Sequence, residues 1–239
     1  MENHSFVLFG ISHIITLLIF LCITILGLHY LRIVSSKVQR RFFRYFRWLV
    51  GLNIMLWPGL MAITHQFDIG IDLPVAVCSI SLILLVIYLW RPVEVLYNIL
   101  FYWILVGSSL ALLLPDLSET FPSLRFFSMF VTHGVNLFSM LYLVIIRKES
   151  PSEGSYNFAF WTLVIYGTCV VLPLDWVLHT NYLFAFSPPD IDFSPVNLLP
   201  KWPWYWFILL GFFYLMFWLV YRLYLRYSET LMSSTEKYA

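Results

Sequence analysis

Charged residues are scarce in this chain of 239 residues: Asp, Glu, Lys and Arg make up only 11% of it, whereas 61% is hydrophobic. Water-soluble domains are about one quarter charged, so this composition excludes that class. The apolar runs match the roughly 20 residues that a helix needs to cross a bilayer, and the weaker alternating segments of a membrane β-barrel are not found. The sequence therefore predicts a helical protein that crosses a membrane several times.

The chain also lacks an internal repeat and any linker long enough to join a second domain. We expect one polytopic membrane domain over residues 1–239, an all-α bundle of seven transmembrane helices. The expected spans lie at about residues 6–31, 48–66, 73–90, 93–114, 123–146, 157–178 and 203–225. Because no basic segment precedes the first span, we expect it to remain as a helix rather than to act as a cleaved signal.

The fourteen basic residues are unevenly distributed between the two sides of the predicted bundle. Twelve of them fall on one side, which the positive-inside rule makes cytoplasmic: Arg32, Lys37, Arg40, Arg41, Arg44, Arg47, Arg91, Arg147, Lys148, Arg222, Arg226 and Lys237. The N-terminus is therefore expected outside and the C-terminus inside. The cluster in the loop at 32–47 is interpreted chiefly as this topology signal, although its arginines and aromatic residues can also form an interfacial helix on anionic headgroups. A net charge of +1 makes nucleic acid a poor candidate partner.

Cysteine is also scarce, and its placement excludes two kinds of site. The three cysteines, Cys22, Cys78 and Cys169, all fall within expected spans, so no extracellular disulfide framework is indicated, and none has metal-ligand spacing. An external zinc site is a weak alternative because no HxxxH or HExxH spacing supports its candidate ligands, His65, Asp68, Asp72, Asp175 and His179. We expect neither a metal nor a cofactor. The last span holds no lysine, which excludes a retinal protein.

Cys78 and His133 are the most informative residues that are present. Polar and ionisable groups at bilayer depth are costly and usually face an interior cavity or pathway. Cys78 lies thirteen residues before Arg91 and His133 fourteen before Arg147, so both are expected ~20 Å from the cytoplasmic boundary, in the outer half of the membrane. A thiol and an imidazole at one depth can serve as nucleophile and general base. Because Pro74 is expected to begin the third span, Cys78 should lie more than one turn inside it, too deep for much influence of the helix N-terminus.

Other polar side chains are expected in the same outer half. His13 lies on the first span, and Asn136 follows His133 by three residues, on the same helical face. Asn136 can orient the imidazole or bond a neighbouring helix, and we slightly favour the structural role. Asp175, at the outer end of the sixth span, can fix an imidazole tautomer. Candidate donors to an oxyanion are Asn136, Ser79 and Asn181.

A set of short motifs occurs in a recognisable order: Gly10-Ile11-Ser12-His13, Leu73-Pro74 followed by Cys78, Leu114-Pro115-Asp116, His133, Asn181-Tyr182 followed by Pro188, and Trp202-Pro203-Trp204-Tyr205. The ordered set resembles the YwaF-like family of bacterial integral membrane proteins, which is related to the animal transmembrane protein 164. The resemblance runs from about Gly10 to Trp206 and implies a bacterial cytoplasmic (inner) membrane as the location. The animal relative is regarded as a phospholipid acyltransferase that uses a cysteine and a histidine.

The resemblance implies that Cys78 is the nucleophile and His133 the general base. We expect His13, Asn136, Asp175, Asn181 and Tyr182 to bind substrate or support the site. The family often has a histidine two residues before the cysteine, where this chain has Ala76, and His13 is a candidate substitute. We expect an intramembrane acyltransferase that moves a fatty acyl group between phospholipids and lysophospholipids through a thioester. The alternatives are an intramembrane lipid hydrolase, a transporter or channel with a polar outer cavity, and a scaffold protein.

Overall fold

The computed structural model describes residues 5–189, 191 and 193–236 of the chain. Within this part the protein is helical, and the only β pairing is an isolated bridge between Ser5 and Glu119. The helices are α1 (Ile11–Ile33), α2 (Ser36–Ile63), α3 (Val77–Trp90), α4 (Glu94–Tyr102), η1 (Trp103–Ser108), α5 (Ser109–Leu113), α6 (Leu124–Ile145), α7 (Ser155–Tyr166), η2 (Gly167–Val171), α8 (Leu172–Leu178), α9 (Ser194–Asn197) and α10 (Trp204–Glu236). Lys237 lies outside the described residues.

Among the described residues, six helical segments are long and apolar enough to cross a membrane, so this is a multi-pass membrane protein. They correspond to six of the seven expected spans, with α4, η1 and α5 forming one continuous segment and α7, η2 and α8 another. The seventh, α3, has 14 residues and is about 21 Å long, shorter than the ~30 Å hydrocarbon core. The structure therefore supports six full spans and one shorter apolar helix.

The expected boundaries were wrong at two places that matter for function. The third apolar segment begins as a helix only at Val77, because the backbone at Ala76 is extended and Pro74 supplies no amide donor to continue a helix toward the N-terminus. The second begins at Ser36 rather than near residue 48, so most of the arginine-rich segment is the first part of α2 and not a loop. At 28 residues, α2 is ~42 Å long and extends beyond a ~30 Å core.

The segment α4–η1–α5 is the most buried of the six spanning segments and forms the centre of the bundle. Its π-helical part, η1, packs against α3, α6 and α10. A second π-helical part, η2, precedes Pro173, which lacks an amide hydrogen and crowds the carbonyl four residues before it. Widened turns of this kind are common near functional sites.

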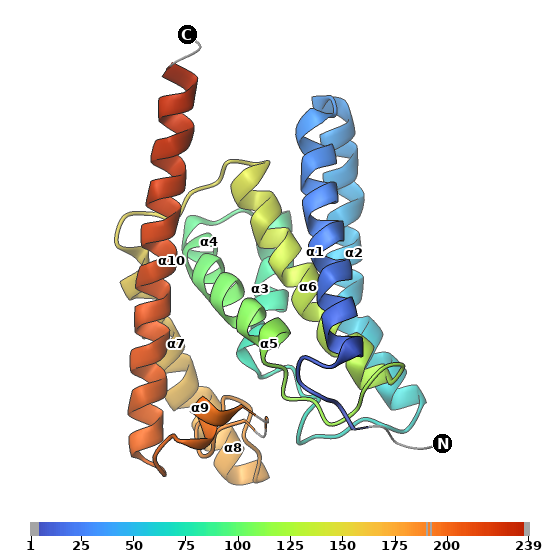
Figure 1. Ribbon diagram of the computed structural model, residues 1–239, viewed down its shortest axis with the longest axis vertical. Helices are drawn as coiled ribbons and strands as arrows, with labels where there is room; N and C mark the ends of the chain where they lie inside the picture. The colour runs from blue at the N-terminus through green and yellow to red at the C-terminus, as the bar shows by residue number, and fades with distance from the viewer. Residues whose placement is uncertain (1–4, 190, 192, 237–239) are drawn as a thin grey trace.

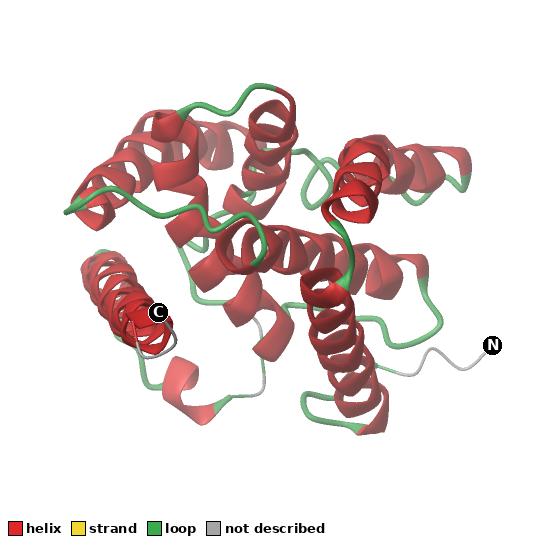
Figure 2. Cartoon of the chain, turned by 90° about the horizontal axis from the view of Figure 1, so that it is seen from above, coloured by secondary structure: helices red, strands yellow, loops and turns green. Residues whose placement is uncertain are grey.

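Figure 1 shows the chain ends at opposite ends of the molecule, with the α1–α2 connection at the same end as the C-terminus. Seen from above in Figure 2, the helices are packed as a bundle, with loops at their ends. We call one end of the bundle the arginine-rich end; it holds the connection after α1, Arg91 and Arg147. We call the opposite end of the bundle the N-terminal end.

Candidate functional site

Cys78 lies in the first turn of α3, as its second residue. The first amide groups of a helix have no acceptor within the helix, and they carry the positive end of the helix dipole. Here the first intrahelical bond at this end runs from the Ile80 amide to the Ala76 carbonyl, at 3.0 Å. The expectation that Cys78 lies too deep in a helix for this effect was therefore wrong: negative charge on or beside its sulfur is favoured by the helix terminus.

Asn136 joins α6 directly to the backbone of Cys78. Its Nδ2 donates to the Cys78 carbonyl at 3.2 Å, and its side chain is fully buried. Arg125, near the start of α6, pairs with Asp72, a few residues before α3, with Nη1 and Oδ1 2.9 Å apart. These two contacts mean that α3 and α6 begin at the same end of the bundle and run in the same direction.

His133 lies one turn before Asn136 on the same face of α6, which places it about 4.5 Å nearer the N-terminal end. Its Nδ1 is 2.7 Å from the Met129 carbonyl, and a carbonyl can only accept. Nδ1 therefore carries the proton in the neutral ring, and Nε2 has a free lone pair that forms no hydrogen bond with the described residues. A carbonyl that fixes the tautomer in this way prepares Nε2 to act as a base.

The central helix packs against Cys78 through its π-helical part, η1. A Cβ atom placed on Gly107 in η1 would lie 3.7 Å from the Cys78 sulfur, so the side chain of the thiol faces this glycine. Three buried side-chain oxygens on the surrounding helices have no hydrogen-bond partner among the described residues: Ser81 Oγ on α3, Ser108 Oγ on η1 and Asn136 Oδ1 on α6. Buried polar atoms without a partner are uncommon in native proteins, so these three oxygens can accept a hydrogen bond from a bound polar group.

Two tyrosines hold the chain that leads into α3. The Tyr166 hydroxyl, at the end of α7 next to η2, donates to the Val75 carbonyl at 2.6 Å. The Tyr182 hydroxyl donates to the Ile69 carbonyl and accepts from the Leu73 amide at 3.2 Å. The segment of turns before Cys78 is thus bonded to α7 and to the loop after α8, which positions the start of α3.

His13 occupies a separate polar contact on α1. Its Nδ1 accepts from the Phe9 amide at 3.0 Å, so Nε2 carries the proton and donates to the Leu112 carbonyl at 2.9 Å. The ring is fully buried and stacks against Phe9, with Phe130 of α6 tilted beside it. Both nitrogens are therefore used in joining α1 to the loop before it and to α5, and neither has a lone pair free for a thiol.

Asp175 and Asn181 form hydrogen bonds with the loop after α8, the loop that also carries Tyr182. Asp175 Oδ1 accepts from the Thr180 hydroxyl at 2.6 Å and from the Tyr182 amide at 3.0 Å. Asn181 Nδ2 donates to the Ser187 carbonyl at 2.8 Å, which closes the loop on itself. Burial, and after it nearby carboxylates, raises the pKa of Tyr182, so its hydroxyl keeps the proton it donates.

Among the described residues, no three His, Cys, Asp or Glu side chains are close enough to share a metal ion. Around the start of α3 the described side chains offer a thiol on Cys78, hydroxyls on Ser81 and Ser108 and an amide on Asn136, with the His133 imidazole one turn before Asn136 on α6. The TMEM164 family model matches residues 8–221, which include Cys78, His133 and the loop after α8.

The chain belongs to the TMEM164 family. No curated protein and no solved structure matches it. Within this TMEM164-family protein, Asn136 bonds the backbone of Cys78, and His133 lies one turn before Asn136 on α6. His13, Asp175 and Asn181 form other contacts.

Sequence reasoning missed four residues of the candidate site: Ser81, Gly107, Ser108 and Tyr166. Ser81 had a usable signal, since it follows Cys78 by three residues in an otherwise apolar run and so shares its helical face. The other three lie outside α3, Gly107 and Ser108 on η1 and Tyr166 at the end of α7. Their proximity depends on helix rotation and on the π-helical turns, which hydropathy does not report.

Proposed function

We propose that this TMEM164-family protein is an intramembrane acyltransferase that moves a fatty acyl group between phospholipids and lysophospholipids through a thioester on Cys78. The observation that carries the proposal is the Asn136 link. It holds α6 against the first turn of α3, with the free Nε2 of His133 one helical turn away. The resemblance described above, in which a cysteine and a histidine transfer acyl groups, supports the same assignment.

The first half of the reaction acylates the protein. The Cys78 sulfur attacks the carbonyl carbon of a phospholipid ester while His133 Nε2 takes the thiol proton. Negative charge moves onto the carbonyl oxygen, where the amide groups of the first turn of α3 can donate to it. The carbon–oxygen bond then breaks, His133 returns the proton to the leaving lysophospholipid oxygen, and the acyl group remains on sulfur.

The second half reverses these roles with a new acceptor. The hydroxyl of another lysophospholipid loses its proton to His133 and attacks the thioester carbonyl. The carbon–sulfur bond breaks, and the sulfur regains a proton from His133. If water replaces the lysophospholipid, the same steps release a fatty acid, so a hydrolase and a transferase differ only in the acceptor.

The membrane setting suits this chemistry. Cys78 and His133 are both half-buried. Cys78 lies at the N-terminal end of α3, and His133 lies in the N-terminal half of α6. We propose that the arginine-rich end is cytoplasmic, in a bacterial inner membrane. The ester carbonyls of the outer leaflet then lie at the depth of the site.

The test is a lysophospholipid acylation assay with purified protein and a labelled phospholipid donor. Cys78→Ala should abolish transfer, and His133→Ala should lower its rate at least ~100-fold, as expected for loss of a general base. Cys22→Ala and Cys169→Ala are matched controls, because both thiols are exposed on the outer surface of the bundle. Full transfer by folded Cys78→Ala would disprove the mechanism. Substrate flux in proteoliposomes that survives this substitution would instead favour a transporter.

A further inference from the structure

A basic pocket lies at the arginine-rich end, remote from Cys78. It is a hollow of about 330 Å³ between the first part of α2 and the end of α6, lined by Arg40, Arg44, Arg47 and Arg147 together with Phe43 and Tyr142. We call it the arginine pocket. Cys78 precedes Arg91, which marks this end, by thirteen residues, or ~20 Å along α3. The pocket is therefore not part of the candidate acyl-transfer site.

Three of the four arginines share one face of α2. Arg40, Arg44 and Arg47 are spaced by four and three residues, which places their side chains on one side of the helix. Arg147 follows the end of α6 and faces them across the hollow. Four guanidinium groups around a volume of this size repel one another unless an anion lies between them.

The protein supplies little negative charge of its own here. Among the described residues, Glu149 is the only carboxylate paired with any of the four, and its Oε1 is 3.4 Å from Arg147 Nε. Glu149 is shared with Tyr88, whose hydroxyl donates to its other oxygen. No described carboxylate pairs with Arg40, Arg44 or Arg47.

Arg47 is held in place but left without an acceptor. Its guanidinium lies 3.9 Å from the centre of the Trp90 ring, and its Nε is buried with no hydrogen-bond partner among the described residues. Arg147 is likewise placed over Phe43, at 5.0 Å. Stacking on aromatic rings fixes these two side chains in advance, which lowers the entropic cost of binding an anion.

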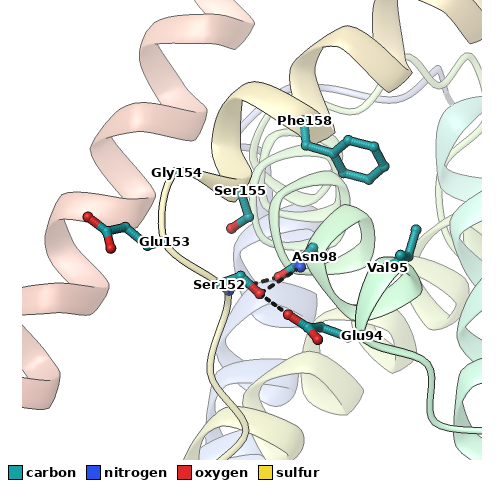
Figure 3. Close-up of a pocket in the computed structure, with 8 residues that line it drawn as sticks. All are labelled: Glu94, Val95, Asn98, Ser152, Glu153, Gly154, Ser155 and Phe158. Carbon is teal, nitrogen blue, oxygen red and sulfur yellow. Dashed lines mark hydrogen bonds between the residues drawn. The ribbon is translucent and has the colours of Figure 1, made fainter.

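A second hollow at the same end differs from the arginine pocket because its polar side chains bond one another. It is lined by Glu94, Asn98 and Ser152, among others, and Figure 3 shows these three joined by hydrogen bonds. Asn98 Nδ2 donates to the Ser152 hydroxyl at 2.9 Å, and that hydroxyl donates to Glu94. Its polar groups satisfy one another and close the loop before α7. In the arginine pocket, by contrast, only Arg147 among the four arginines pairs with a described carboxylate.

We infer that the arginine pocket binds a negatively charged phosphate group. Guanidinium groups match the oxygens of a phosphate in forked pairs, and basic pockets between membrane helices on the cytoplasmic side are typical sites for phosphorylated headgroups. The phosphate can come from an anionic phospholipid of the adjoining leaflet or from a free phosphate compound. This inference stands independently of acyl transfer.

The experiment titrates the purified full-length protein in neutral detergent with three probes: short-chain phosphatidylglycerol, short-chain phosphatidylcholine and inorganic phosphate. Affinity is measured by microscale thermophoresis. Arg44→Gln and Arg147→Gln should each weaken binding of the anionic probe about tenfold, as expected for loss of one charge-assisted contact. Arg40→Gln, which alters a solvent-exposed arginine, repeats the test if either variant folds poorly.

The matched control is Arg41→Gln, on the same helix and of the same charge, because Arg41 lies beside Tyr45 and does not line the pocket. Its affinity should equal that of the wild type. Binding of phosphatidylglycerol but not inorganic phosphate identifies a lipid site, and binding of inorganic phosphate that competes with the lipid identifies a free phosphate site. The inference is overturned if neither anionic probe binds more tightly than phosphatidylcholine, or if Arg41→Gln weakens binding as much as Arg44→Gln.

Discussion

Replacing Asn136 by leucine should separate stability from activity. Leucine has the same branched skeleton as asparagine but no polar atoms. The substitution removes the hydrogen bond from Asn136 to the Cys78 carbonyl. Because this bond is 3.2 Å long, at the long end of the normal range, its loss should cost about 0.5–1 kcal/mol of stability. It also removes the buried Oδ1 that has no partner among the described residues, and relieving such an atom is worth about 1–3 kcal/mol.

The larger methyl groups of leucine work against this gain, since overpacking a core commonly costs about 1–3 kcal/mol. The contributions largely cancel, so the free energy of unfolding should change by less than about 1 kcal/mol. Activity should behave differently. Without the Asn136 link the first turn of α3 is no longer tied to α6, and a shift of ~1 Å between reacting groups can cost ~100-fold in rate.

The assay measures acyl transfer and thermal unfolding on the same detergent-purified sample. Asn53→Leu is the control, because Asn53 is also buried and also reaches α6, donating to Thr132 Oγ1 at 3.4 Å. That contact joins α2 to α6 and does not touch Cys78, so transfer should be unchanged. Wild-type transfer by well-folded Asn136→Leu would refute the proposed role of the α3–α6 link.

Two further substitutions test the packing that supports the site. Gly134→Ala should lower stability by about 1–3 kcal/mol, because the new Cβ would overlap the Phe20 ring of α1. Gly59→Ala is the control: its Cβ would have no atom within 4 Å, so the melting temperature should stay unchanged or rise. Asp72→Asn should lower stability by about 1–3 kcal/mol, because Arg125 loses its charged partner at 2.9 Å near the starts of α3 and α6. Melting temperatures in detergent check both predictions, and equal stability of the two glycine variants, or an unaffected Asp72→Asn, would contradict them.

Much of the fold was predictable because long apolar runs report spans directly. The predicted and observed ends of α6 differ by one residue at each end, and those of the segment from Glu94 to Leu113 by one. Hydropathy does not detect where a helix begins inside an apolar run, so the start of α3 was misplaced by four residues. It also does not separate an arginine-rich loop from an arginine-rich helix, which is why the start of α2 was missed.

The candidate site was predictable only in part. Counting residues from Arg91 and Arg147 predicted one depth for Cys78 and His133, whereas Asn136 bonds Cys78 and His133 lies about 4.5 Å nearer the N-terminal end. The preference for a structural role of Asn136 is consistent with its bond to the Cys78 carbonyl. The roles of His13 and Gly107 depend on contacts with residues far away in the sequence. The acceptor of His13, for example, is the carbonyl of Leu112, 99 residues later. Such contacts follow from how the helices rotate and cross, which a single sequence does not specify.

The most direct measurement of the central claim is intact-protein mass spectrometry after incubation with phospholipid. The account predicts a mass increase of one fatty acyl chain that hydroxylamine removes and that peptide mapping places on Cys78. The adduct should persist in Cys22→Ala and Cys169→Ala and disappear in Cys78→Ala. Acyl transfer without any adduct on Cys78, or an adduct confined to Cys22 or Cys169, would contradict the account.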